Sequence, residues 1–175
     1  MMVYKYLIVG SNCKMRWEMD KLLPYVQRIP GPIDNCVLLD PMGIDYILSG
    51  EYLEDIKNKN YRIAEVINEK PRFIFKNKIM NIHNDLTSED FLNHSIERIE
   101  NFKNNIFNED IFLVMSLYTG ISAKIERFQE LFSRYPSLER INFFMLDKIK
   151  NFDFFNSYNL LKGNKIENFL KMKKK

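Results

Sequence analysis

Cysteine and histidine are scarce in this chain of 175 residues, which contains only two of each. The cysteines, Cys13 and Cys36, form neither a CxxC pair nor the framework of several disulfides that holds small secreted domains together. A zinc site would need both cysteines together with His83 and His94, and these four residues lack the close spacing of zinc-binding motifs. The sequence therefore predicts no bound metal and no cofactor.

A strong charge of one sign and long apolar runs are also missing. The formal net charge is +3, and part of it comes from a short basic tail made of Lys171, Lys173, Lys174 and Lys175. The nearly neutral remainder argues against a broad nucleic-acid-binding face. No segment approaches the length of a membrane span, and the short apolar run at 6–9 lacks the cleavage site of a secretory signal. We therefore expect a cytoplasmic protein with no nucleic-acid partner and no membrane span.

The composition that remains is typical of one globular domain. Hydrophobic residues make up 46% of the chain and aromatic residues 14%, which is enough for a substantial core. A chain of this length is too short for two domains of typical size, and it contains no internal repeat or low-complexity linker. We expect residues 1–175 to form a single domain that ends in the basic tail.

Hydrophobic periodicity predicts alternating strands and helices. The expected elements are a strand over 3–9 followed by a helix, a loop around 30–32, a brief apolar run at 36–39, short helices over 42–68, a hairpin over 72–83 with its turn at 76–77, a long helix over 91–106 after a capping box at 87–90, a strand over 111–115, a helix over 121–132, a strand over 141–146 and a basic amphipathic helix near 166–170. This order favours an α/β fold in which helices flank one mixed β-sheet.

The most informative segment is Val9–Cys13, where an apolar strand passes through a tight turn into a helix. Gly10 permits a sharp turn, and Ser11 or Asn12 can cap the helix. Cys13 would then lie where outward N–H groups and the positive end of the helix dipole lower the pKa of a thiol and favour the nucleophilic thiolate. The alternative is that Cys13 is a small apolar residue packed beneath the turn.

A thiolate nucleophile needs a base or cationic partner, usually a histidine held by a third polar group. His83 follows a predicted strand, at a sheet edge where active-site groups are commonly displayed, whereas His94 falls on a polar face of the long helix. His83 is therefore the candidate base. Either Asp34 or Asp85 could orient its imidazole, and the sequence leaves this choice open. We expect Asp34 to accept a hydrogen bond from His83 or, as turn aspartates commonly do, from backbone N–H groups of the turn at 10–13.

Three blocks of the sequence resemble a family of mostly bacterial, uncharacterised proteins described as papain-like cysteine peptidases. Its members show G-S-N-C after the first strand, P-F-D-W some twenty residues later, and an H-D pair after a strand. The matching blocks here are Gly10–Cys13, Pro32–Asn35 and His83, within roughly the first two thirds of the chain. The departures are Ile33 and Asn35, in place of the aromatic residue and the tryptophan, and Asn84, which separates His83 from Asp85.

The resemblance implies a Cys13 nucleophile, a His83 base and a structural or catalytic role for Asp34. It also implies a papain-like α+β core, as an alternative to the single mixed sheet that the order of elements favours.

The leading hypothesis is a thiol hydrolase or acyl transferase that acts on a peptide, acyl or glycan-linked substrate. Cys13 would attack a carbonyl, and His83 would hold the thiolate as an ion pair and then protonate the leaving group. The backbone N–H of Cys13, with Ser11 or Asn12 nearby, would form an oxyanion hole.

Two other functions remain open. The turn at 10–12 could bind the phosphate of a phosphorylated or nucleotide-sugar substrate of a transferase, although the chain has no GxGxxG motif and no P-loop. The departures in the second block are compatible with a catalytically inactive binding or assembly module on the same scaffold.

Overall fold

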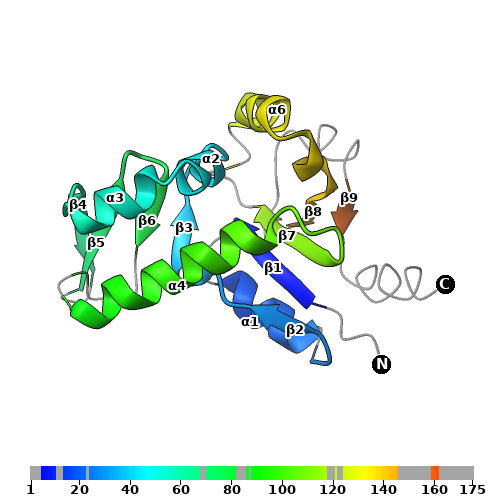
Figure 1. Ribbon diagram of the computed structural model, residues 1–175, viewed down its shortest axis with the longest axis horizontal. Coiled ribbons are helices and arrows are strands. Elements are labelled where there is room, and N and C mark those ends of the chain that lie inside the picture. The colour runs from blue at the N-terminus through cyan, green and yellow to red at the C-terminus, as the bar shows by residue number, and fades with distance from the viewer. Residues whose placement is uncertain are drawn as a thin grey trace.

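A computed structural model describes residues 5–10, 14–22, 24–67, 70–81, 86, 88–117, 121, 124–145 and 159–161 (Figure 1). The described elements are β1 (Lys5–Gly10), α1 (Lys14–Leu22), β2 (Gln27–Ile29), the 3-10 helix η1 (Pro32–Asn35), β3 (Cys36–Leu38), α2 (Gly43–Leu48), α3 (Glu51–Lys57), β4 (Arg62–Ile67), β5 (Lys70–Phe75), β6 (Ile79–Asn81), α4 (Glu89–Asn105), β7 (Ile111–Leu117), α6 (Ile125–Arg134), the 3-10 helix η2 (Pro136–Arg140), β8 (Asn142–Met145) and β9 (Asn159–Leu161). Of the helices among them, none is long and apolar enough to cross a membrane.

One sheet is parallel throughout and has the strand order β2-β1-β7-β8-β9. Residues 6–9 of β1 and 111–115 of β7 are all buried. Such uninterrupted apolar runs are typical of parallel strands that are covered on both faces.

The order of the parallel strands reverses between β1 and β7. After β1 the chain passes through α1 to β2 on one side, and after β7 it passes through α6 to β8 on the other side. In Figure 1, α1 accordingly lies towards the bottom of the molecule and α6 at its top. In open parallel sheets, ligands bind outside the carboxyl ends of the strands at such a switch point. The segment 11–13 follows the carboxyl end of β1, which is one of the two strands at this switch point.

The second sheet is antiparallel, with the order β3-β6-β5-β4. Its β5–β6 hairpin confirms the turn predicted at Lys76 and Asn77, whose φ angles are 46° and 53°. The N–H of Lys78 closes the turn on the carbonyl of Phe75 at 2.9 Å. Two positive φ angles at the central residues of this turn, within a three-residue connection, match the right-handed twist of the paired strands.

The long helix α4 connects the two sheets and crosses in front of both (Figure 1). It begins as predicted, because the Ser88 hydroxyl caps it by accepting from the N–H of Phe91 at 3.1 Å. It packs against α3, η1 and β1, and its Phe102 is fully buried. Leu7 of β1 and Phe75 of β5 belong to the same cluster of core residues as Phe102. The two sheets therefore share one hydrophobic core.

The predicted α/β class is confirmed, but the single mixed sheet is wrong, because parallel and antiparallel strands form separate sheets. The prediction of helix over the end of 42–68 is also wrong, since residues 62–67 form β4. A bulge in β4 explains the error: Ile63 lies opposite Phe73 and Val66 opposite Pro71, with a register shift between them. The bulge puts Ile63 and Val66 on one face three residues apart, which is a helix-like spacing.

Two further strands were not predicted. β2 is a three-residue edge strand without an apolar pattern, and its pairing with residues 5–7 defines it. β9 lies in the aromatic-rich remainder of the chain and pairs with β8. The amphipathic helix predicted near 166–170 lies outside the described residues.

Candidate functional site

The structure describes one of the six predicted site residues, Asp34. The other five lie outside the described residues: Ser11, Asn12, Cys13, His83 and Asp85. The described residues that flank these five residues show where in the fold the segments 11–13 and 82–85 begin. Residues 11–13 join Gly10 to Lys14, and residues 82–85 follow Asn81.

The 3-10 helix η1 packs against β1, which precedes the segment 11–13, and against β3, which pairs with the strand that precedes the segment 82–85. β3 follows η1 directly and pairs with β6, with Cys36 opposite Asn81. Asp34 comes two residues before Cys36, and His83 comes two residues after Asn81. The second and third sequence blocks therefore start from the same end of the β3–β6 pair.

The first block begins at Gly10, at the carboxyl end of β1, which lies against Leu38 at the other end of β3. A Cβ atom at this position would lie 2.6 Å from Cδ2 of Leu38 and 2.7 Å from Cε of Met115. Any side chain at this position would have to displace the ends of the Leu38 and Met115 side chains, so glycine allows β1 to pack closely against β3 and β7. η1 also packs against β1. η1 thus lies against β1 and adjoins the ends of the second and third blocks, while Gly10 of the first block lies against Leu38, two residues further along β3.

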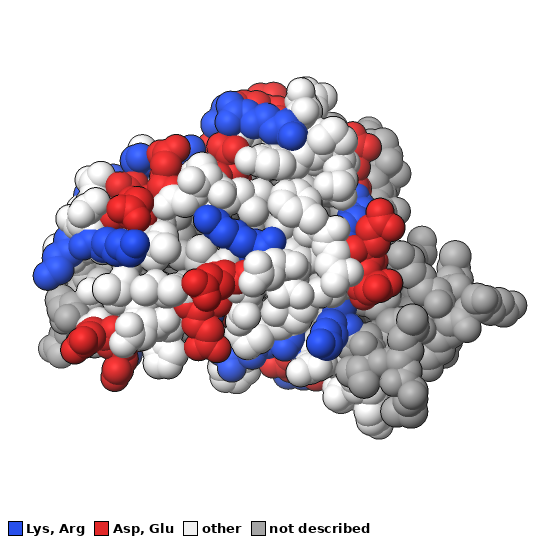
Figure 2. Space-filling model, in the orientation of Figure 1, with Lys and Arg blue, Asp and Glu red and all other residues white. Residues whose placement is uncertain are grey.

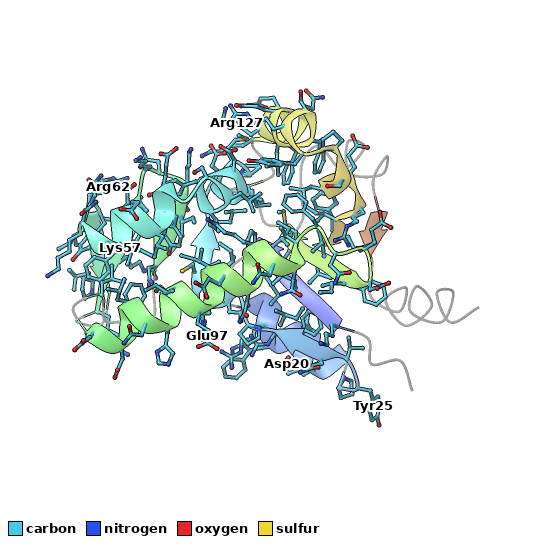
Figure 3. The ribbon with its side chains drawn as sticks, viewed as in Figure 1. Asp20, Tyr25, Lys57, Arg62, Glu97 and Arg127 are labelled. Atoms are coloured by element: carbon cyan, nitrogen blue, oxygen red, sulfur yellow. The ribbon has the colours of Figure 1, made fainter. Side chains whose placement is uncertain are left out.

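Asp34 is 1% exposed and belongs to a chain of polar contacts through four elements. Its Oδ2 pairs with the Arg28 guanidinium of β2 and accepts from the N–H of Gly31 at 3.3 Å. Nε of Arg28 lies 3.8 Å from the carboxylate of Asp20, on α1 beside β2 (Figure 3). The hydroxyl of Tyr6 in β1 donates to that same carboxylate at 2.8 Å. Together these contacts hold η1, β2, α1 and β1 in one arrangement.

Burial raises the pKa of Asp34, because the charged carboxylate has lost its water. The Arg28 guanidinium, the N–H of Gly31 and the more distant charges of Arg98 and Arg16 oppose this rise. The described backbone donor is the N–H of Gly31, next to η1 itself, whereas we expected donors from the turn at 10–13; a bond from that turn stays a prediction, because residues 11–13 lie outside the described residues. A bond from His83 to Asp34 stays a prediction, since residue 83 lies outside the described residues.

A pocket of about 210 Å³ opens between η1 and the first half of α4. It is lined by Pro32, Cys36, Tyr52, Asn81, Ser88, Asp90, Phe91, His94, Ser95 and Arg98. Cys36, Tyr52 and Asn81 are buried, whereas Asp90 and His94 are exposed. The pocket therefore extends from a polar rim on α4 to a buried floor at the β3–β6 pair. Its floor residue Asn81 is two residues from His83.

Sequence reasoning missed the pocket and the place of His94 in it. His94 is exposed, as expected, but it lines the pocket together with Asp90 and Arg98. These three residues are spaced four apart and therefore share one face of α4. That spacing is the signal in the sequence that could have indicated the pocket.

The second cysteine is buried, as its apolar surroundings predict. Cys36 is 2% exposed, and its Sγ lies 3.9 Å from the hydroxyl of Tyr52. Burial and the neighbouring Cys36 raise the pKa of Tyr52, so this phenol stays protonated at neutral pH.

The described part of the chain contains no metal-binding cluster. No group of three histidine, cysteine, aspartate or glutamate residues in it could hold a metal ion. On the face shown in Figure 2, basic and acidic side chains are interspersed.

Comparison of the chain with protein-family models, curated proteins and solved structures gives no match. The function is therefore argued from the site.

Proposed function

We propose that this protein is a thiol hydrolase or acyl transferase with Cys13 as the nucleophile and His83 as the base. The observation that carries the proposal is that the described ends of the three sequence blocks all adjoin η1 or the short strand β3, beside the switch point of a parallel sheet. The proposal does not depend on a papain-like core, because it requires only a strand, a turn and a helix around the cysteine.

The position of Cys13 suits a nucleophile. The residue directly precedes Lys14, the first residue of the nine-residue helix α1, and follows β1 by three positions. The first N–H groups of a helix have no intrahelical partner, and the helix dipole is positive there. Both effects favour a thiolate over a thiol. The strand-order reversal between β1 and β7 adds a place where a substrate can reach this residue.

His83 completes the proposed chemistry. It takes the proton of the Cys13 thiol, and the resulting thiolate attacks the carbonyl carbon of the substrate. The imidazolium then protonates the leaving group as the carbon–heteroatom bond breaks, which leaves an acyl thioester on Cys13. Water or another nucleophile attacks the thioester and gives its proton to His83, and the thiolate leaves. Protons balance over the cycle, and no further reactant is needed.

Asp34 has a positioning role in this proposal. Its carboxylate is engaged by Arg28 and by the N–H of Gly31, which holds η1 beside the ends of β1 and β6. The contacts with Arg28 and Gly31 support a positioning role for Asp34. A catalytic role would require a hydrogen bond between Asp34 and His83. Asp85 remains the other candidate for orienting His83.

The first experiment measures alkylation of the two cysteines by iodoacetamide against pH, with mass spectrometry to assign the site. We expect Cys13 to react at about pH 6, because its pKa should lie well below the ~8.5 of an ordinary thiol. Cys36 should react slowly at every pH, since it is 2% exposed. His83→Ala should shift the reactivity of Cys13 to higher pH, and Cys36→Ala, the matched control, should not.

Acylation by p-nitrophenyl acetate then tests the reaction itself. A mass increase of one acetyl group on Cys13, lost in Cys13→Ala and retained in Cys36→Ala, would support the proposal. If Cys13 is labelled only after unfolding, the residue is part of the core and the proposal is wrong. The inactive binding module would then be the better description.

A further inference from the structure

We propose that an open cavity on α1 binds a neutral sugar ring carried by the substrate, with Trp17 as the surface on which the ring stacks and Asp20 as a hydrogen-bond acceptor. That the sugar belongs to the substrate rests on the proposed function, whereas the binding of a sugar does not.

The cavity has a volume of about 430 Å³ and shares none of its described lining residues with the pocket between η1 and α4. Its described lining residues all lie on α1 and are Arg16, Trp17, Asp20 and Lys21. Residues three and four apart are neighbours on a helix surface, so these four side chains form one stripe of α1. The volume is within the ~300–1,000 Å³ of pockets that bind small molecules.

The cavity lies close to the proposed nucleophile. Trp17 is three residues past Lys14, the first residue of α1, which corresponds to about 4.5 Å along the helix axis. The Cα–Cβ bonds of a helix tilt toward its N-terminus, so the side chain of Trp17 covers the turn before it. A ring bound on Trp17 would therefore be held at the start of α1, where Cys13 joins the helix. The position suits the part of a substrate that is recognised while the neighbouring carbonyl reacts.

Trp17 exposes most of its indole to solvent. Its exposed fraction is 69%, whereas Met19, on the opposite side of α1, is 1% exposed. A single exposed apolar side chain is ordinary, but Trp17 also lines a cavity between polar side chains. The indole thus offers a large flat apolar face to a ligand.

Asp20 is held at one oxygen and open at the other. Its Oδ1 accepts from the Tyr6 hydroxyl at 2.8 Å and lies 3.8 Å from Nε of Arg28. Burial, together with this hydrogen bond, raises the pKa of Tyr6, so its hydroxyl stays protonated and donates. In the part of the chain that the structure describes, Oδ2 of Asp20 accepts no hydrogen bond, and the side chain is 52% exposed. A carboxylate fixed in this way presents its second oxygen to a hydroxyl donor of a ligand.

An indole among polar groups suits a sugar better than an aromatic or aliphatic ring. A purely apolar ring would displace water from Arg16, Asp20 and Lys21 without replacing its hydrogen bonds, which costs free energy. A pyranose with equatorial hydroxyls has an apolar C–H face for the indole. Its hydroxyl rim can accept from the two cations and donate to the carboxylate. Because the hydroxyls are neutral, this match does not depend on the net charge of the cavity.

The test titrates the full-length Cys13→Ala protein, which excludes turnover, with methyl β-glucopyranoside, whose ring substituents are all equatorial. Nicotinamide, a flat aromatic ring, and cyclohexanol, an aliphatic ring with one hydroxyl, are titrated in parallel. Trp17 is the only tryptophan of the chain, so the NMR signal of its Nε1–H reports on the cavity. We expect the glucoside to bind with a Kd of about 1–10 mM, at least about tenfold more tightly than either comparator.

Two variants in the same background provide the matched comparison. Trp17→Ala and Tyr25→Ala each remove an exposed aromatic side chain, but only Trp17 lines the cavity. The backbone N–H signal of Lys21 replaces the indole signal as the reporter. Trp17→Ala should weaken glucoside binding about tenfold or more, and Tyr25→Ala by less than about twofold.

Asp20→Asn tests the acceptor. Tyr6 and Arg28 both require an acceptor at Oδ1, so the amide carbonyl should take that place and turn the N–H₂ group toward the ligand. The variant therefore loses the acceptor for the ligand hydroxyl, and glucoside binding should weaken about fivefold or more.

The titration of the Cys13→Ala protein needs no substitution in the cavity, so it tests the inference even if Trp17→Ala fails to fold. An unshifted Trp17 signal, equal or tighter binding of either comparator, equal losses in the two aromatic variants, or unchanged binding in Asp20→Asn would each overturn the inference. The two proposals fail separately. Trp17-dependent glucoside binding without acylation of Cys13 refutes only the catalytic one, and acylation without glucoside binding refutes only the sugar site.

Discussion

Two buried aspartates respond to their surroundings in opposite ways. Burial raises the pKa of Asp34, and its cationic neighbours only partly offset this rise. Burial also raises the pKa of Asp55, but hydrogen bonds from Tyr46, Asn60 and Lys76 outweigh it and lower the pKa overall. The Tyr46 hydroxyl donates to Asp55 at 2.5 Å, and the Asn60 amide donates at 2.9 Å. For Asp55 the three hydrogen bonds together outweigh burial, whereas for Asp34 burial outweighs the cations and the N–H of Gly31.

These directions predict opposite effects on stability against pH. A lowered pKa means that Asp55 contributes stability above its unfolded pKa of about 4, and this stability is lost as the pH falls through the folded pKa. A raised pKa means that the contribution of Asp34 is fully present below about pH 4 and declines as the pH rises through its folded pKa. Below pH 4, the free energy of unfolding should therefore fall less steeply in Asp55→Asn than in the unsubstituted protein. Above pH 4, it should fall less steeply in Asp34→Asn than in the unsubstituted protein.

Urea unfolding of both variants and of the unsubstituted protein between pH 2 and pH 7 measures how the free energy of unfolding depends on pH. Each aspartate variant is the control for the other, because both substitutions replace a carboxylate by an amide of the same shape. The same change in pH dependence for the two variants would contradict the assigned directions.

At the scale of elements, the β5–β6 turn depends on residues that tolerate a left-handed backbone. Asn77 has a φ of 53°, and its side chain accepts from Arg62 at 2.8 Å on the surface. Asn77→Gly and Asn77→Ala both lose this hydrogen bond, but only alanine has a Cβ that clashes at positive φ. We expect the alanine variant to be less stable than the glycine variant by about 1 kcal/mol, measured by urea unfolding. Equal stabilities would show that the turn is not held in this conformation.

The hairpin turn and the capped start of α4 could be predicted because each depends on residues adjacent in sequence. β4 could not, because its bulge creates a spacing of apolar residues that a helix also shows. β2 could not either, since a three-residue edge strand forms only through pairing with β1. The candidate site shows the same difference between local and long-range features. The three sequence blocks could be recognised from adjacent residues, whereas the pocket forms only where η1 and α4 meet in the folded protein.

At the scale of the whole molecule, α4 and α6 connect parts that are distant in sequence. Phe102 of α4 is fully buried in the core that the two sheets share. α6, which carries Arg127 (Figure 3), is tied to the region of α2 by contacts from Arg127 to Asp40 and from Arg134 to Asp45. We infer that the two sheets unfold as one cooperative unit.

Phe102→Ala tests this inference. Removing a buried phenylalanine costs about 3–5 kcal/mol, and both sheets should lose that stability together. Phe107→Ala is the matched control, because Phe107 is 46% exposed and should cost about 1 kcal/mol or less. Coincident urea transitions from Trp17 fluorescence and far-UV circular dichroism would support a single unit, and separate transitions would refute it.

The sequence by itself determined the local features: the strand β1 before Cys13 and the helix α1 after it, the hairpin turn, the cap of α4 and the α/β class. These depend on the conformational preferences of neighbouring residues and on the periodicity of apolar side chains. Only the tertiary structure decided that the strands divide into two sheets, that the order reverses between β1 and β7, and that η1 meets α4 over a pocket. Those outcomes depend on strand pairing and on packing between segments that are far apart in sequence, such as Lys5 of β1 and Ile111 of β7. Their free energy is gained only when the segments meet, and no local pattern along the chain records it.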